Sequence, residues 1–226
     1  MLGFDDLEIY VVNLIDYYII SGMWAAQIFY FLSFIPQIWT NYIGKSGTGI
    51  SDLFMFGYLN GYATFLLYAF CRDLPFAYKF WPSLAATGVL IMILQRLYYD
   101  TSKAGRLIGF VYGLNLAAML FVIPFALQDP YGIGSLCGWA NVFFTSVSQL
   151  PQIVHIYKTK SVEGFSVMFV LLMGMAGFLE FTTSYLAGLP AQTIFSALRN
   201  IIAVLIYLVQ FYLYKKSNTS HDTQKS

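Results

Sequence analysis

Apolar residues fill most of this chain in long runs, and short polar segments separate seven such runs. Each run has about the 20 residues that an α-helix needs to cross the hydrocarbon core of a bilayer. With seven spans, little of the chain remains outside the membrane, so we expect an all-α membrane protein with a single domain, 1–226, and no soluble module. The predicted spans are 17–42, 53–71, 80–99, 107–127, 133–156, 167–187 and 193–214.

A stretch near the end of the first span occurs again in the fifth. SFIPQIWTNYIGKSGTGIS at Ser33–Ser51 and SQLPQIVHIYKTKSVEGFS at Ser148–Ser166 are identical at nine of nineteen positions, at an offset of 115. The same offset pairs Gln95 with Gln210. Such repetition predicts two copies of one three-helix unit. In chain order, the predicted parts are repeat one at 17–100, a linker helix at 101–130, repeat two at 131–215 and a polar tail without fixed structure at 216–226.

The two repeats are predicted to be parallel. Four crossings precede the fifth span, so it starts on the same side of the membrane as the first, and the linker helix acts as the inverter. Parallel repeats related by an axis along the membrane normal, with a substrate site at their interface, are one established transporter design.

Positive charges are distributed unevenly between the two sides. Nine lysines and arginines lie in loops 1–2, 3–4 and 5–6, in the tail or at the adjoining span ends; two lie in loop 2–3, and Arg199 lies inside a span. The positive-inside bias predicts a cytosolic C-terminus and an N-terminus outside or in a lumen. The outward segments contain no N-glycosylation sequon, which favours a bacterial inner membrane over a lysosomal or vacuolar one.

The proline of each motif weakens its own helix. Pro36 has no backbone N–H, so the carbonyl of Leu32 loses its helical partner, and in lipid that carbonyl needs another donor. Gln37 and Ser33 are close enough in sequence to supply one. The residues that we expect to act as hinge and gate are Pro36, Gln37, Pro151 and Gln152.

A few polar or amphipathic side chains within the spans are candidates for binding a solute. Polar groups inside a bilayer are costly, so they usually have a function or a partner, and they can also bridge two helices structurally. The residues that we expect to contact a substrate are Asn60, Tyr68, Trp139, Asn141, Glu180 and Asn200.

Two acidic residues are candidates for proton coupling. Glu180 lies deep in its predicted span, and Asp52 lies at the start of the second span, directly after Ser51. A buried acid in a membrane is a functional candidate by default. Two structural alternatives compete: Glu180 forms a fixed salt bridge with Arg199, or Asp52 only stabilises the N-terminus of its helix.

The two motifs resemble those of the PQ-loop family, which includes lysosomal cystine and cationic amino-acid exporters. The SWEET sugar carriers are more distant relatives that share a three-plus-one-plus-three arrangement of helices. The resemblance implies alternating access, with Pro36 and Pro151 as hinges. The K-S-x-x-G-x-S extension at Lys45–Ser51 and Lys160–Ser166 is most similar to the cystine-exporter branch.

Two features depart from the patterns of these relatives. Cystine exporters place an aspartate, their proton acceptor, where this chain has Met173. SWEET carriers have asparagine after the motif proline, where this chain has Gln37 and Gln152. Asn200 resembles the sugar-contacting asparagine of SWEETs, but the matching position in repeat one is Ala85.

Taken together, these features predict a secondary transporter for an amino acid, cationic or cystine-like, with proton coupling. A SWEET-like sugar uniporter and a membrane receptor or scaffold without transport are the alternatives. The sequence has no metal-ligand spacing, no phosphate-binding glycine loop and no basic patch outside the cytosolic loop ends, so we expect no enzyme activity, no cofactor and no nucleic-acid partner. The expected partners are a small solute, protons and the lipid bilayer, and a homo-oligomer is left open.

Overall fold

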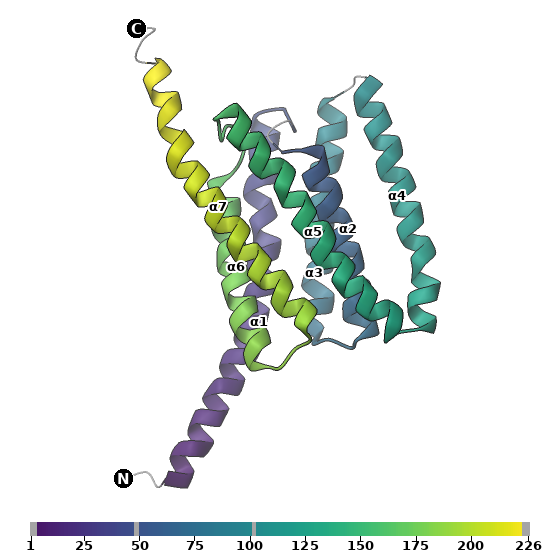
Figure 1. Ribbon diagram of the computed structural model, residues 1–226, viewed down its shortest axis with the longest axis vertical. Helices are drawn as coiled ribbons and strands as arrows, with labels where there is room; N and C mark the ends of the chain where they lie inside the picture. The colour runs from purple at the N-terminus through teal and green to yellow at the C-terminus, as the bar shows by residue number, and fades with distance from the viewer. Residues whose placement is uncertain (1–3, 48–49, 101–102, 223–226) are drawn as a thin grey trace.

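The chain folds into seven α-helices, as a computed structural model shows for residues 4–47, 50–100 and 103–222 (Figure 1). The helices are α1 (Phe4–Ile43), α2 (Asp52–Cys71), α3 (Phe76–Tyr99), α4 (Lys103–Gln128), α5 (Gly132–Thr159), α6 (Val167–Leu186) and α7 (Ala191–Asp222).

Six of these helices are long and apolar enough to cross a membrane, judged over the residues that the structure describes. The exception is α5, whose inner side carries a stripe of buried polar residues: Asn141, Thr145, Ser148, Gln149 and Gln152. Its outer side is apolar and exposed at Leu136, Phe143, Val147, Leu150 and Val154. The mean hydropathy of α5 is therefore lowered by side chains that face protein, while its outer side suits lipid.

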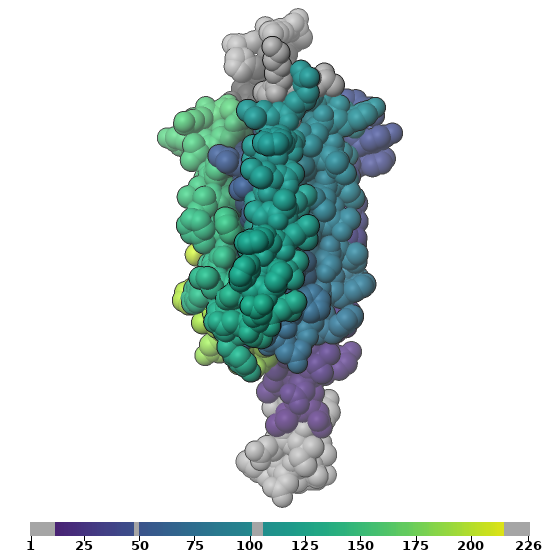
Figure 2. Space-filling model, turned by 90° about the vertical axis from the view of Figure 1, so that its right-hand side faces the viewer, coloured from purple at the N-terminus to yellow at the C-terminus, as the bar shows by residue number. Residues whose placement is uncertain are grey.

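The helices form two three-helix bundles joined by α4, which confirms the predicted three-plus-one-plus-three architecture. In repeat one, α3 packs against both α1 and α2; in repeat two, α7 packs against both α5 and α6. The most extensive contacts cross between repeats, from α1 to α6 and from α2 to α5. Helix α4 touches its neighbours sparsely and runs along the face shown in Figure 2.

The two ends of the bundle differ, and we name them by the repeated motif. At the motif end lie the α1–α2 and α5–α6 connections; at the far end lie the α2–α3, α4–α5 and α6–α7 connections (Figure 1). A large core, which includes Phe34, Phe54, Phe169 and Tyr207, fills the motif half. A smaller core, which includes Met23, Phe65 and Tyr78, fills the far half.

Two helices extend further than the hydrophobic pattern predicts. Helix α1 begins at Phe4 and projects beyond the far end, and α7 continues to Asp222 beyond the motif end (Figure 1). The prediction of an unstructured tail from 216 is thus wrong as far as Asp222. Extending an existing helix by one residue is far easier than starting a new one, so polar residues next to a span readily join its helix.

Helices α2 and α5 approach each other closely at two glycines. A Cβ atom added to Gly57 would lie 2.2 Å from Cβ of Ser148, and one added to Gly61 would lie 2.2 Å from Cγ2 of Thr145. Small residues at such positions let membrane helices pack backbone to backbone. This contact brings the polar stripe of α5 against repeat one.

Candidate functional site

The glutamine of the first motif binds the backbone of the second repeat. Gln37 is fully buried. Its Nε2 donates to the carbonyl of Gly164 at 3.0 Å, and its Oε1 accepts from the backbone N–H of Ser166 at 3.0 Å. One amide side chain therefore satisfies both a donor and an acceptor of the α5–α6 loop.

The second motif makes the reciprocal contact. Gln152 is also fully buried, and its Oε1 accepts from the backbone N–H of Ser51 at 3.0 Å. The position that corresponds to Gly164 is Gly49, which lies outside the described residues. Each motif glutamine thus holds the loop of the other repeat, and we call this arrangement the crossed glutamines.

The hydrogen bonds of Gln37 differ from the expected one to the carbonyl of Leu32. Its donor group crosses to Gly164 and also reaches Oδ1 of Asn41 at 3.0 Å, while Ser33 donates to the carbonyl of Tyr30. Support for the motif helices comes from the third helix of each repeat. Gln95 donates to the carbonyl of Ile38 at 3.1 Å, and Gln210 donates to the carbonyl of Ile153 at 2.8 Å, each two residues beyond a motif proline.

Asp52 lies at the motif end, where it binds an arginine. Nε of Arg96 lies 3.2 Å from Oδ1 of Asp52, and Nη1 of Arg96 lies 2.7 Å from Oδ2 of Asp100. Ser51 caps α2 by accepting from the N–H of Phe54. Asp52 is thus the first residue of its helix, as the structural alternative requires, and its carboxylate is engaged by Arg96.

A small cavity lies at the centre of the bundle, between the two repeats. Its volume is about 40 Å³, which suffices for a few water molecules but not for an amino acid or a sugar. Every helix except α4 contributes to its wall. The lining residues are Gln27, Tyr30, Tyr58, Tyr62, Phe65, Pro82, Asn141, Thr145, Met173, Glu180, Ser196, Arg199 and Asn200.

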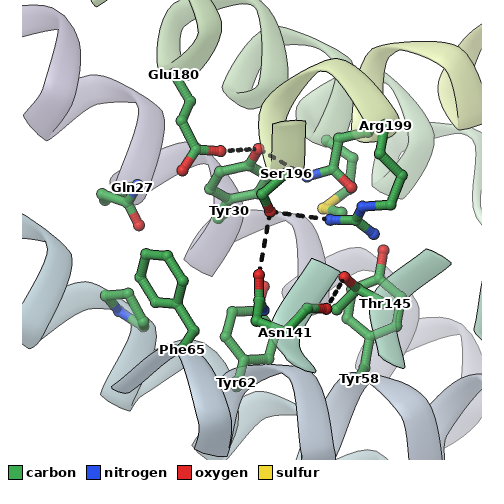
Figure 3. Close-up of a pocket in the computed structure, with 13 residues that line it drawn as sticks. Gln27, Tyr30, Tyr58, Tyr62, Phe65, Asn141, Thr145, Glu180, Ser196 and Arg199 are labelled. Carbon is green, nitrogen blue, oxygen red and sulfur yellow. Dashed lines mark hydrogen bonds between the residues drawn. The ribbon is translucent and has the colours of Figure 1, made fainter. Parts of the chain in front are cut away.

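Glu180 is held on one side of this cavity by repeat one. The hydroxyl of Tyr30 donates to Oε2 of Glu180 at 2.6 Å and accepts from Nδ2 of Asn200 at 2.7 Å. Glu180 is 3% exposed. A single tyrosine of α1 thereby links α6 and α7 at the level of the cavity (Figure 3).

Arg199 lies across the cavity, beyond Tyr30 and Ser196 (Figure 3). Its Nη2 donates to Oγ of Ser196 at 3.3 Å, and Ser196 donates to Oδ1 of Asn141 at 3.3 Å. Nδ2 of Asn141 donates to the carbonyl of Gly61 at 2.9 Å, which reaches back to repeat one.

Glu180 and Arg199 line one cavity without forming the salt bridge that was the structural alternative. Among the described residues, ion pairs within 4.0 Å join Lys79 to Asp73 and Arg96 to Asp52 and Asp100. The two side chains are instead separated by the hydroxyl groups of Tyr30 and Ser196 (Figure 3).

Hydrogen-bonded aromatic layers close the cavity toward both ends. On the motif side, Nε2 of Gln149 donates to Tyr58 at 2.6 Å, and Tyr207 donates to Oε1 of Gln149 at 2.7 Å. On the far side, the hydroxyls of Tyr68 and Thr193 lie 3.2 Å apart, and Tyr78 contacts Ser184 in the same way. The cavity therefore lies between two hydrogen-bonded layers, one toward each end of the bundle.

The predicted substrate residues fall into two groups. Asn141, Glu180 and Asn200 line the cavity, whereas Asn60, Tyr68 and Trp139 lie outside it. Asn60 donates to the carbonyl of Phe56 in its own helix, and Tyr68 belongs to the far-side closure. Trp139 packs against Phe195 and is 45% exposed; because it lies two residues from Asn141, about 200° around the helix, the two cannot face the same cavity.

The sequence interpretation missed several cavity residues. Gln27, Tyr30, Ser196 and Thr145 line the cavity, and Arg199 was considered only as a partner for Glu180. One signal was available on α1, where the spacing of three and four residues places Gln27, Tyr30, Phe34, Gln37 and Asn41 on one face, and all five are buried.

The fold is similar to that of a solved protein. A structure described as a eukaryotic SWEET transporter aligns with a TM-score of 0.70 at 17% identity, covering 90% of this chain and 99% of that chain. At this identity the likeness concerns the fold alone.

Two curated proteins are similar in sequence. Cystinosin of Drosophila melanogaster is 26% identical over 239 aligned residues, covering 88% of this chain and 59% of that protein. An uncharacterised protein of Schizosaccharomyces pombe is 27% identical over 162 residues, covering 66% of this chain and 53% of that protein. The chain therefore spans a little over half the length of these relatives.

The family comparison matches both repeats. The PQ loop repeat model covers residues 21–78 and 133–193, more than half of the chain, and each matched segment contains one motif proline and one crossed glutamine. With the motif residues, the repeated bundles and this match in agreement, the chain belongs to the PQ-loop repeat family.

Proposed function

We propose that this protein is a secondary transporter that moves a small polar solute, an amino acid, across a membrane by alternating access. The central observation is the cavity at the interface of two parallel repeats, which is lined by an acid and a guanidinium. Transporters of this design bind substrate at such an interface near mid-membrane. The similarity to cystinosin supports an amino acid as the solute.

Gating follows from the contacts at the two ends. Opening the motif end requires separation of the crossed glutamines and of the Tyr58–Gln149–Tyr207 chain. Opening the far end requires separation of Tyr68 from Thr193. Pro36 and Pro151 interrupt the helical hydrogen bonding of α1 and α5, so these helices are the ones that we propose to bend.

We assign proton coupling to Glu180. Among the described residues it is the one acid that lines the cavity, whereas Asp52 lies at the motif end in contact with Arg96. A coupling group must contact the substrate path and be able to change its protonation. Asp52 is then a gate residue whose ion pair tightens the closed motif end.

The orientation of the protein in its membrane is proposed from its charge distribution. We propose that the motif end faces the cytosol and the far end faces the outside or a lumen, because lysine and arginine concentrate at the motif end. The absence of an N-glycosylation sequon from the outward segments favours a bacterial inner membrane.

A SWEET-like sugar uniporter is the second candidate, and Asn200 favours it. This asparagine lines the cavity with Oδ1 unpaired, and amides are common sugar contacts. A uniporter has no need of the buried Glu180, and this difference separates the two candidates.

Uptake by proteoliposomes tests both. A panel of labelled amino acids and sugars is offered to the reconstituted protein with and without a pH gradient. We expect gradient-driven accumulation of an amino acid, and we expect Glu180→Gln to abolish this accumulation. Glu163→Gln, at an exposed acid of the α5–α6 loop, is the matched control. Sugar uptake that is indifferent to the gradient and to Glu180→Gln would support the uniporter instead.

A further inference from the structure

The cavity holds an acid and a guanidinium that are kept apart. Glu180 accepts from Tyr30, and Arg199 donates to Ser196, with no ion pair between the acid and the guanidinium. In a low-dielectric interior, opposite charges on one cavity attract strongly unless something holds them apart or lies between them. Figure 3 shows the two side chains on either side of the Tyr30 and Ser196 hydroxyls.

Several polar atoms that line this cavity have no hydrogen-bond partner among the described residues. They are Nε and Nη1 of Arg199, Oδ1 of Asn200 and Nε2 of Gln27. Asn200 is 5% exposed and Gln27 is 3% exposed. Because buried polar atoms are nearly always paired, these free donors and this free acceptor indicate a place for a polar ligand.

The free atoms match a particular ligand chemistry. The planar guanidinium of Arg199 has unused N–H groups at Nε and Nη1, which can donate to a carboxylate. Across the cavity, the carboxylate of Glu180 and Oδ1 of Asn200 can both accept from an ammonium group. The remaining wall near these groups is apolar at Phe65, Pro82 and Met173.

We infer that the cavity, once it is widened by movement of the helices that line it, binds one small α-amino acid with an uncharged side chain, its carboxylate on Arg199 and its ammonium on Glu180 and Asn200. This inference rests on the proposed function and specifies the solute. A ligand with both charges would pair with the guanidinium of Arg199 and with the carboxylate of Glu180. Such a ligand would bring no net charge into the membrane.

The same reasoning excludes three other solutes. A cationic amino acid adds a second positive charge, for which the cavity offers no further carboxylate. Cystine carries two amino-acid head groups, and the cavity has a single arginine. A sugar leaves both Arg199 and Glu180 without a charged partner, which is unfavourable for groups removed from water.

Ligand-induced stabilisation of the full chain in lipid nanodiscs tests the inference. Thermal unfolding is followed by tryptophan fluorescence with L-alanine, alaninamide, N-acetylalanine, L-lysine or glucose. We expect L-alanine alone to raise the unfolding temperature in a concentration-dependent way. Stabilisation by either capped analogue equal to that by L-alanine would overturn the inference, because each analogue lacks one of the two charges.

Variants of Arg199 test whether this residue binds the carboxylate of the ligand. Arg199→Gln should weaken L-alanine binding by on the order of ten- to a hundredfold, and Arg199→Lys should restore part of it. Arg106→Gln, at an exposed arginine of α4, should leave binding unchanged. Undiminished binding to Arg199→Gln would overturn the assignment, and if that variant fails to fold, the ligand panel on the unaltered chain still decides.

The panel also separates this inference from the proposed function. If the liposomes accumulate lysine or cystine and L-alanine neither binds nor moves, the inference fails and amino-acid transport stands. If a sugar binds and no amino acid does, both fail.

Discussion

At the scale of single residues, the crossed glutamines are the most specific feature of the motif. Each is fully buried and contacts backbone groups of the other repeat. A buried backbone group left without its partner costs about 1–3 kcal/mol. The glutamines therefore stabilise the contact between the two repeats at the motif end.

Removing these contacts should loosen the motif end. We expect Gln37→Leu to destabilise the folded protein by about 1–3 kcal/mol, because Gly164 and Ser166 lose their partners, and we expect Gln152→Leu to act similarly. Thermal unfolding and protease access to the α5–α6 loop measure the effect. Gln128→Leu, at the exposed end of α4, is the control, and wild-type behaviour of the Gln37→Leu, Gln152→Leu double variant would contradict this role.

At the scale of helices, the α2–α5 contact depends on two glycines. Gly57 and Gly61 leave no room for a side chain against Ser148 and Thr145. Overpacking of this kind typically costs about 1–3 kcal/mol, and here it would push α2 away from a helix that lines the cavity.

We therefore expect Gly61→Leu to lower the unfolding temperature and to impair transport. The matched control is Gly113→Leu on α4, because nothing lies within 4 Å of a Cβ at that position. Equal unfolding temperatures for the two variants would show that close approach of α2 and α5 is not required.

The motif prolines provide a second test on helices. Replacing Pro36 or Pro151 with alanine restores a backbone donor and stiffens the helix. We expect each variant to keep the fold and to transport more slowly, because opening requires the helix to bend. Pro124→Ala in α4 is the control, and unchanged transport by the Pro36→Ala, Pro151→Ala double variant would remove the hinge role.

At the scale of the whole molecule, the architecture was predictable and the contacts between repeats were not. Seven apolar runs and a motif repeated at an offset of 115 suffice for two parallel bundles and a linker. Glu180 and Asn200 stood out because polar groups are costly in a span. Tyr30 and Ser196 did not, because such residues are common in spans and their role depends on neighbours from other helices.

Hydrogen bonds between residues that are far apart in sequence could not be predicted, for the same reason. Gln37 and the N–H of Ser166 are 129 residues apart in the chain, and no local pattern indicates that they meet. That Trp139 lies outside the cavity could have been predicted, since helical geometry places it opposite Asn141.

Access to the cavity from the two sides tests the central claim most directly. Ser196 is buried in the cavity wall, and cysteine is close to serine in size. In a chain with Cys71 and Cys137 replaced by serine, Ser196→Cys is exposed in sealed vesicles to a membrane-impermeant maleimide, added from one side or the other. Alternating access predicts labelling from both sides, slowed in each case by saturating L-alanine. Labelling from one side only, with and without L-alanine, would contradict alternating access to this cavity.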